Sequence, residues 1–212
     1  TCALPISVVC TADTTKTNKG YECPTYQQNN KEGAGVYMFD ANNGELLWWS
    51  SVDNNSTPVD SDIRFTENAD LKYSVVSQIN TIDRNSDGLV DHLYFGDLAG
   101  QAFRVDINNA PKLTGTPTVG DLKNNFVKRV VTLFSEQVSS GLSPRFYEMP
   151  SVSIHVDPVT GKSFAAVAYS SGNRSSPLIG TVTAGESTIT ASAKDGVFVV
   201  YDNDVVSKNL YD

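Results

Sequence analysis

The 212-residue chain lacks an uninterrupted apolar run long enough to cross a bilayer, which takes about 18 residues or more. It also lacks the basic, apolar and small-residue segments of a secretory signal. We therefore predict no membrane-spanning segment and place any export signal upstream of Thr1. Because the sequence starts without a methionine and stops at Asp212 directly after a strand-like run, we interpret it as a fragment of a longer protein.

Histidine and cysteine are scarce, which limits metal and catalytic chemistry. The chain has two histidines, His92 and His155, and three cysteines, Cys2, Cys10 and Cys23. No cysteine pair has the Cys-x-x-Cys spacing, which argues against zinc. With two histidines expected to be structural, no serine in a nucleophile elbow and no glycine-rich phosphate loop, we predict that the protein is not an enzyme. Cys10 and Cys23 either close a disulfide, as export allows, or stay reduced.

Basic residues are also fewer than acidic ones. The 24 acidic and 16 basic residues give a formal net charge of -8. A surface of that sign repels phosphate backbones, so we predict no nucleic-acid partner. Long helical patterns are absent as well, whereas Asn, Ser, Thr, Gly and Asp are abundant. That composition favours short strands joined by turns, and we therefore predict an all-β fold.

A recurring unit organises the chain: an apolar strand, a turn that begins with aspartate and ends with glycine, and a second strand. It occurs at 36–49, 93–105 and 154–169, and a further copy is expected to begin at 197. Its aspartates are Asp40, Asp97, Asp157 and Asp202, with separations of 57, 60 and 45 residues. A loose period of about 40 to 50 residues is typical of four-stranded propeller blades with loop insertions. We therefore predict part of a β-propeller, with a β-sandwich of several hairpins as the alternative.

The rest of the sequence predicts a leader and one domain. Residues 1–34 are polar and without pattern, and are expected to be a surface loop or a fragment leader. Residues 35–212 are expected to be a partial β-propeller domain. Further strands are expected at 74–79 and 126–134, and a Ser/Thr-rich excursion at 172–195.

The clearest local signal for chemistry is the segment 83–91, Asp-Arg-Asn-Ser-Asp-Gly-Leu-Val-Asp. Oxygen-bearing side chains fall at its positions 1, 3, 5 and 9, and a glycine that permits a sharp turn falls at position 6. Calcium takes about six to eight oxygen ligands, and this alternation places them on one side of a curled loop. The candidate ligands for Ca2+ are Asp83, Asn85, Asp87, the backbone carbonyl of Leu89, and Asp91.

The loop begins like an EF-hand but ends differently. Position 12 is Tyr94 instead of the bidentate glutamate, and 93–95 is strand-like instead of helical. Asp91 must then supply any bidentate contact, and we expect weak to moderate affinity, suited to extracellular calcium. Mg2+ is disfavoured because it resists such an all-protein cage. The alternative is an ordinary Asx turn without metal, but three carboxylates in nine residues repel each other when no cation is present.

The calcium loop runs directly into the hairpin at 93–106, Leu-Tyr-Phe-Gly-Asp-Leu-Ala-Gly-Gln-Ala-Phe-Arg-Val-Asp. This combination resembles the C-terminal propeller of PilY-type type IV pilus proteins, in which an Asp/Asn/Asp-Gly loop precedes a Gly-Asp…Gly…aromatic-Arg-hydrophobic-Asp hairpin. Segments 168–177 and 198–205 resemble the family's Gly-rich turn and the strand that follows it. The resemblance covers most of the chain from Gly35 onward.

The resemblance implies a modified seven-bladed, quinoprotein-type propeller, of which this chain holds a partial set of blades. It implies a protein exported through the periplasm to the pilus tip at the bacterial surface. There it is expected to support pilus biogenesis, adhesion and twitching motility, with calcium controlling extension and retraction. The implied partners are minor pilins, and a host or surface ligand bound through regions outside this chain. The implied calcium ligands are the five named above.

Two other readings stay open. The segment 39–48 also resembles the tryptophan-docking repeat of pyrroloquinoline-quinone dehydrogenases, whose propeller is similar. Such an enzyme needs that repeat many times, yet the equivalent positions after Gly100 and Gly161 hold Phe103 and Phe164. The other reading is a structural surface repeat protein with a calcium clip. It shares the metal site and lacks a pilus partner, so co-purification with minor pilins separates it from the pilus protein.

Overall fold

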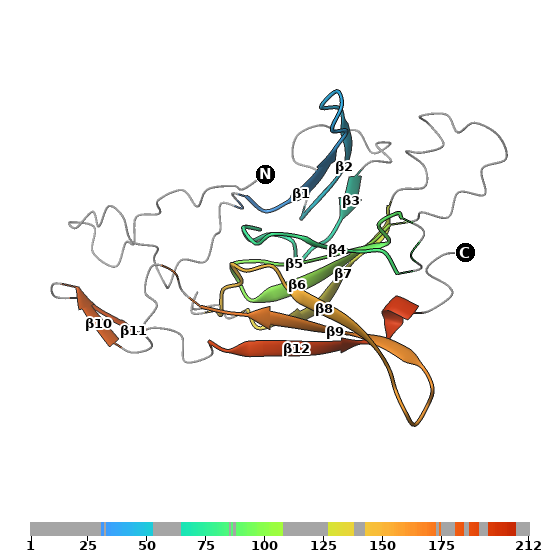
Figure 1. The fold of residues 1–212 in the computed structure, drawn as a ribbon. Helices are drawn as coiled ribbons and strands as arrows, with labels where there is room; N and C mark the ends of the chain where they lie inside the picture. The colour runs from blue at the N-terminus through green and yellow to red at the C-terminus, as the bar shows by residue number, and fades with distance from the viewer. Residues whose placement is uncertain are drawn as a thin grey trace.

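The structure is a computed structural model whose described residues form an all-β protein, as predicted (Figure 1). It describes residues 31, 33–52, 65–84, 86, 88–107, 127–137, 143–172, 174, 181–184, 187–190 and 195–206. Most of the predicted leader 1–34, including all three cysteines, lies outside this part of the chain. None of the helices in the described ranges is long and apolar enough to cross a bilayer.

Three sheets and one separate hairpin make up the described structure. The first sheet has the order β1 (Val36–Phe39), β2 (Leu46–Ser51) and β3 (Phe65–Glu67), with β3 parallel to β2. The central sheet is an antiparallel meander of β4 (Asn80–Ile82), β5 (His92–Gly96), β6 (Gln101–Ile107) and β7 (Val127–Ser135). The third sheet has the order β12 (Val197–Asp202), β9 (Ser163–Ser170) and β8 (Ser151–Val156). The separate hairpin pairs β10 (Thr181–Ala184) with β11 (Ser187–Thr190), and the 3-10 helix η1 spans Asp204–Val206.

The three complete hairpin units predicted from the sequence are confirmed as β1–β2, β5–β6 and β8–β9, one in each sheet. Two of their turns share one backbone pattern: the amide of Gly44 donates to the carbonyl of Asp40, and that of Gly161 to the carbonyl of Asp157, both at 2.8 Å. Both glycines have a φ near +70°, at 73° and 68°, a region that L side chains rarely adopt. The glycine that closes each turn is therefore required by the backbone.

The aspartate that begins each turn holds the turn with its own carboxylate. Asp40 Oδ1 accepts from the amide of Asn42 at 2.7 Å, and Asp157 Oδ1 accepts from the amide of Val159 at 2.8 Å. Asp97 does the same inside the protein, where its Oδ1 accepts a backbone amide hydrogen bond from Ala99 at 2.9 Å. The recurring aspartate is therefore a turn residue that satisfies backbone donors.

Other expectations met different outcomes. The strand predicted at 126–134 is confirmed as β7, but 74–79 is not a strand, and pairing starts only at Asn80 in β4. The strand expected to begin at 197 is confirmed as β12, and the residues after 206 lie outside the described part of the chain. β12 pairs antiparallel with β9 and is the third strand of its sheet, with backbone partners from Ser170 to Ala165.

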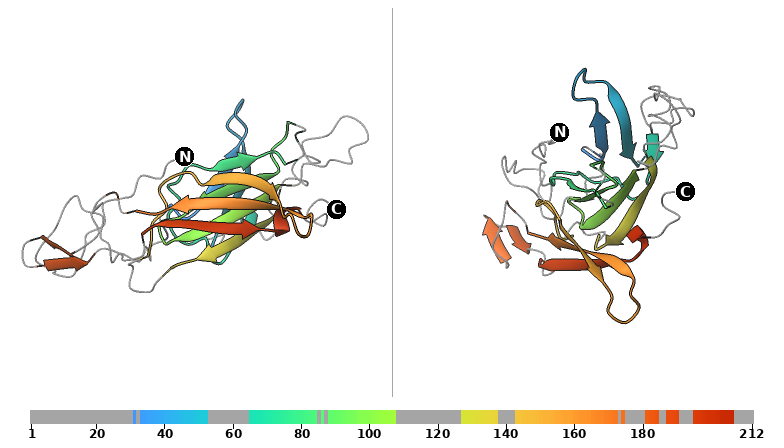
Figure 2. Two further views of the ribbon diagram at one scale, coloured as in Figure 1. Left: turned by 60° about the horizontal axis from the view of Figure 1, so that its bottom comes forward. Right: turned by 45° about the vertical axis from the view of Figure 1, so that its right-hand side comes forward.

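The central sheet is covered on both faces, so the three sheets form stacked layers (Figure 2). Side chains alternate between the faces of a strand, and β5 shows this directly, with Phe95 on one face and Tyr94 on the other. The face toward the first sheet packs Leu93, Phe95, Phe103, Val105 and Ile107 against Val36 and Trp48. The face toward the third sheet packs Tyr94 and Ala102 against Phe146, Ala165, Val167 and Tyr169.

The outer faces of this stack carry exposed apolar side chains. In the third sheet, Val197 and Tyr201 are 72% and 65% exposed, and in the first sheet Tyr37 and Phe39 are both 51% exposed. The described residues thus form a stack with two apolar ends, and they do not themselves close into a ring of blades.

Candidate metal-binding loop

The loop 83–91 joins β4 to β5, and the sheet holds its two ends. Ile82 pairs with His92 across the two strands, and the amide of Asp91 donates to the carbonyl of Ile82 at 2.8 Å. The carbonyl of Asp91 in turn accepts from the amide of Ile107 in β6, also at 2.8 Å. The loop therefore projects from a fixed base at the edge of the central sheet.

Asp83 curls the loop around its carboxylate. Its Oδ1 accepts from the amide of Ser86 at 2.6 Å, and its Oδ2 accepts from the amide of Gly88 at 2.8 Å. Ser86 and Gly88 have positive φ values of 61° and 89°, which let the chain turn sharply enough to present these amides.

Asp91 is the residue that best fits a metal ligand. Its side chain is almost fully buried, at 1% exposure. Oδ2 accepts from the amide of Arg84 at 2.6 Å, whereas Oδ1 has no hydrogen-bond partner among the described residues. Leaving a buried acceptor unsatisfied costs about 1–3 kcal/mol, and more when the group is charged. A cation bound at Oδ1 removes that penalty.

The predicted ligand set is described in part. Asp83, Leu89 and Asp91 are described, while Asn85 and Asp87 lie outside the described residues. The side chain of Leu89 is half-exposed, in keeping with a role for its backbone carbonyl only. Within the described ranges, no three His, Cys, Asp or Glu side chains gather where they could hold a metal ion. Of the five predicted ligands, the structure therefore describes the carboxylates of Asp83 and Asp91, at opposite ends of the loop, and the carbonyl of Leu89.

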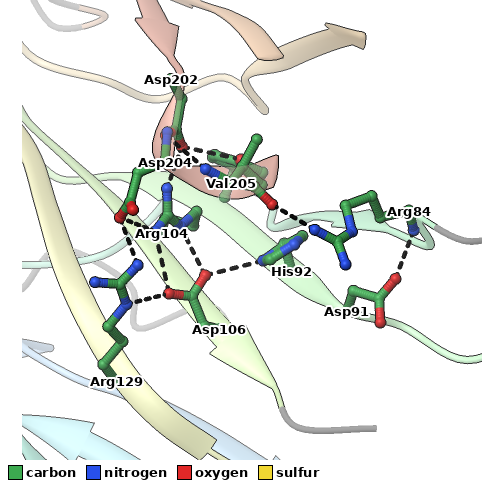
Figure 3. Close-up of polar contacts among 10 residues, drawn as sticks. Arg84, Asp91, His92, Arg104, Asp106, Arg129, Asp202, Asp204 and Val205 are labelled. Carbon is green, nitrogen blue, oxygen red and sulfur yellow. Dashed lines mark hydrogen bonds and ion pairs between the residues drawn. The ribbon is translucent and has the colours of Figure 1, made fainter. Parts of the chain in front are cut away.

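An ion network with a buried centre lies beside the loop, and the sequence did not predict it (Figure 3). Arg104 is its centre, with Nε 2.7 Å from Asp106 Oδ1, Nη1 2.5 Å from Asp202 Oδ2, and Nη2 3.0 Å from Asp204 Oδ2. Arg129 adds ion pairs to Asp106 and Asp204. Arg104 and Asp106 come from β6 and Asp202 from β12, so the network crosses the interface between the central and third sheets.

Burial and pairing set the protonation of this network. Burial alone raises the pKa of the Asp106 carboxyl, but hydrogen bonds from His92, Arg104 and Arg129 outweigh it and hold the pKa well below its usual range. Burial lowers the pKa of Arg104, and its bonds to Asp106 and Asp202 more than reverse that effect. Both groups therefore stay charged.

His92, which the sequence predicts to be structural, belongs to this network. It is fully buried, and its Nδ1 lies 2.9 Å from Asp106 Oδ1. His155, also predicted to be structural, lies on the exposed β8 strand, with its Nε2 2.8 Å from Ser153 Oγ. The sequence did carry one signal for the network, since Arg104 and Asp106 are two residues apart in a strand and therefore share a face. The partner of Arg104 in β12, Asp202, is 98 residues away in the sequence, so sequence reasoning could not find it.

Arg84 connects the loop to this interface. Its backbone amide holds Asp91, and its Nη1 donates to the carbonyl of Val205 in η1 at 2.8 Å. Asp202 lies next to the same helix, because its Oδ1 accepts from the amides of Asp204 and Val205 at 3.2 and 3.3 Å. The loop and the ion network therefore meet at η1, as Figure 3 shows.

Comparison of the chain with protein-family models, with curated proteins and with solved structures gave no match.

Proposed function

We propose that the chain is a calcium-binding part of a PilY-type β-propeller, in which the loop 83–91 holds the ion and no catalysis takes place. The observation that carries the metal site is Asp91 Oδ1, a buried carboxylate oxygen without a hydrogen-bond partner in the described part of the chain. The hydrogen bonds of Asp83 are compatible with a plain Asx turn, so the support for a metal site comes from Asp91. A cation would satisfy its buried Oδ1, and the oxygen donors in this loop are those that Ca2+ takes.

The stacking of the sheets supports the propeller part of this proposal. Consecutive sheets of a propeller pack face to face around an axis, and each is an antiparallel meander. The central sheet is such a meander and is packed on both faces. Each sheet carries the same aspartate-turn hairpin. The apolar outer faces at Tyr37 and Val197 fit positions where further blades pack.

The pilus part of the proposal rests on the resemblance of segments 83–106, 168–177 and 198–205 to the PilY-type propeller. In this proposal the protein lies at the tip of a type IV pilus on the bacterial surface. Calcium orders the loop beside the interface between the sheets, and a surface that minor pilins recognise becomes available. Calcium occupancy then controls pilus extension, retraction and adhesion.

The calcium site is tested by calorimetric titration after chelator stripping, with the wild-type chain, Asp91→Asn and Asp40→Asn. Asp40→Asn is the matched control, because Asp40 has a similar turn hydrogen bond in an exposed hairpin. We expect one site in the wild type and in the control, and binding weakened by about tenfold or more in Asp91→Asn, because the number of ligand charges tunes affinity. Equal binding by Asp91→Asn and the wild type, or no binding by the wild type, overturns the site.

The remaining alternatives have their own tests. Binding of purified minor pilins in calcium and not in chelator supports the pilus protein, whereas calcium binding with no pilin binding supports a structural repeat protein with a calcium clip. Trp48 is almost fully buried and packs in the core between the first and central sheets. That position suits a residue that locks neighbouring sheets together. Saturable binding of pyrroloquinoline quinone to the chain is the result that favours the enzyme instead.

A further inference from the structure

The second residue of the loop, Arg84, bonds to two separate parts of the structure. Its backbone amide donates to Asp91 Oδ2 at 2.6 Å, on the loop side. Its guanidinium reaches η1, where Nη1 donates to the carbonyl of Val205 at 2.8 Å. These partners are 7 and 121 residues away in the sequence. One residue thus spans the candidate metal loop and the C-terminal helix η1.

The helix η1 is held at the interface between the central and third sheets. Val205 is buried and packs in the same cluster as Tyr94 of the central sheet and Val167 of the third. The amides of Asp204 and Val205 donate to Asp202 Oδ1, and Asp202 Oδ2 accepts from Arg104. Any shift of η1 therefore acts on both the ion network and the packing between the two sheets.

The position of Arg84 in the chain depends on the loop. It follows Asp83 directly, and its amide donates to Asp91 at the other end of the loop. A guanidinium-to-carbonyl bond is charge-assisted and directional, so a displacement of the backbone at Arg84 weakens it. Whatever orders the loop between Asp83 and Asp91 therefore also holds Arg84 on Val205.

We propose that Arg84 is a positioning residue that transmits cation binding in the loop 83–91 to η1, and through η1 to the packing of the third sheet on the central one. This inference rests on the proposed calcium site and adds the route by which occupancy reaches the rest of the protein. A cation that orders the loop fixes the Arg84 backbone, and its guanidinium then holds Val205. Without the cation the loop loosens, and η1 loses this contact.

A second route leaves the loop through β5. His92 follows Asp91 and bonds to Asp106, which pairs with Arg104. If occupancy travels this way, the side chain of Arg84 is not needed. Arg84→Met separates the two routes, because it removes the guanidinium and keeps both the backbone amide that holds Asp91 and an unbranched side chain of similar reach. Arg174→Met is the matched control, because Arg174 makes an exposed ion pair with Glu148, which belongs to neither the loop nor η1.

The experiment measures two quantities on the wild type and both variants: calcium affinity by calorimetry, and hydrogen exchange of the Asp204 and Val205 amides by NMR, with calcium and with chelator. In the wild type and in Arg174→Met, we expect calcium to slow exchange of these amides by about tenfold, the scale of one charge-assisted hydrogen bond. In Arg84→Met we expect calcium to bind within a few-fold of the wild type and to leave the exchange of these amides unchanged.

The outcomes separate this inference from the calcium site itself. If the wild type binds no calcium, the proposed function fails and the coupling fails with it. If calcium binds but does not slow η1 exchange in the wild type, the site stands and the coupling is wrong. If calcium slows exchange equally in Arg84→Met and the wild type, the coupling runs through β5, and the role assigned to Arg84 is wrong.

Discussion

Arg104 and Asp202 are 98 residues apart in the sequence, yet Arg104 Nη1 donates a 2.5 Å hydrogen bond to Asp202 Oδ2. Arg104 lies in β6 and Asp202 ends β12, so the bond crosses the interface between the central and third sheets. Both side chains are buried. Buried charges are tolerated only when they are paired and hydrogen-bonded. Removing either partner would therefore leave a buried, unpaired charge between the two sheets.

Removing the Arg104 guanidinium from the centre of the ion network should destabilise the fold strongly. Arg104→Met leaves Asp202 and Asp106 without their principal partner in a buried site, and we expect a loss of about 3–5 kcal/mol in the free energy of unfolding. Urea denaturation gives the value. Arg174→Met is the control, because its ion pair with Glu148 is 63% exposed at both ends and should change stability by less than about 1 kcal/mol. Equal losses in the two variants contradict the role of Arg104.

Asp97 should make the protein less stable as pH rises from about 4 towards 8. Burial is the largest cause that raises the pKa of Asp97 to about 8, against the lowering effect of backbone hydrogen bonds from Gln101 and Ala99. The unfolded carboxyl has a pKa of about 3.9. Between these values the folded state binds the extra proton, so stability is fully present below about pH 4 and is lost as pH rises through about 8.

The check on Asp97 is the urea midpoint from pH 4 to 8 in the wild type, Asp97→Asn and Asp157→Asn. We expect Asp97→Asn to remove most of the decline, because an amide does not ionise. Asp157 occupies the same place in an exposed turn, where hydrogen bonds from Thr160 and Val159 lower its pKa, so Asp157→Asn should keep the decline. If stability still declines between pH 4 and 8 in Asp97→Asn, a titrating group other than Asp97 causes the decline.

Calcium should reverse the stability order of the wild type and Asp91→Asn. In chelator we expect Asp91→Asn to be as stable as the wild type or more stable, because it removes a buried, uncompensated charge and keeps an acceptor for the Arg84 amide. Calcium at one hundred times the dissociation constant should stabilise the wild type by about 2.7 kcal/mol. It should stabilise Asp91→Asn by about 1.4 kcal/mol or less, because a variant that binds about tenfold more weakly is then at only about ten times its own dissociation constant. Thermal unfolding in the two conditions measures the order, and an order that does not change rules out Asp91 as a ligand.

Gly96 should be intolerant of any side chain. A Cβ at this position lies 2.7 Å from Phe146 Cβ, in the core between the central and third sheets. We expect Gly96→Ala to cost about 1–3 kcal/mol through overpacking. Gly172→Ala is the control, because a Cβ there meets nothing within 4 Å. Chemical denaturation of both variants tests the prediction, and a Gly96→Ala variant as stable as the control shows that Phe146 moves aside freely.

The parts of the fold that the sequence predicted correctly are those set by near neighbours. The hairpins around Asp40, Asp97 and Asp157 depend on turn residues within five positions of each other. The strand predicted at 197 is also confirmed, as β12, but the pattern Val-Phe-Val-Val-Tyr-Asp is compatible with any strand, and only the tertiary structure shows that its partner is β9. The prediction of a strand at 74–79 was wrong, because the apolar residues Val75 and Ile79 pack in the core although this segment does not pair in a sheet.

The candidate site divides in the same way. The spacing of oxygen donors in 83–91 is a local property, and the sequence by itself determined it, together with the all-β class and the repeated aspartate turns. Only the tertiary structure decided that Asp91 is buried with an unsatisfied oxygen, that Arg84 reaches Val205, and that Arg104 pairs with Asp202. Burial and long-range pairing depend on which sheets stack against each other. That stacking is a cooperative outcome of the whole core and is not encoded in any short segment.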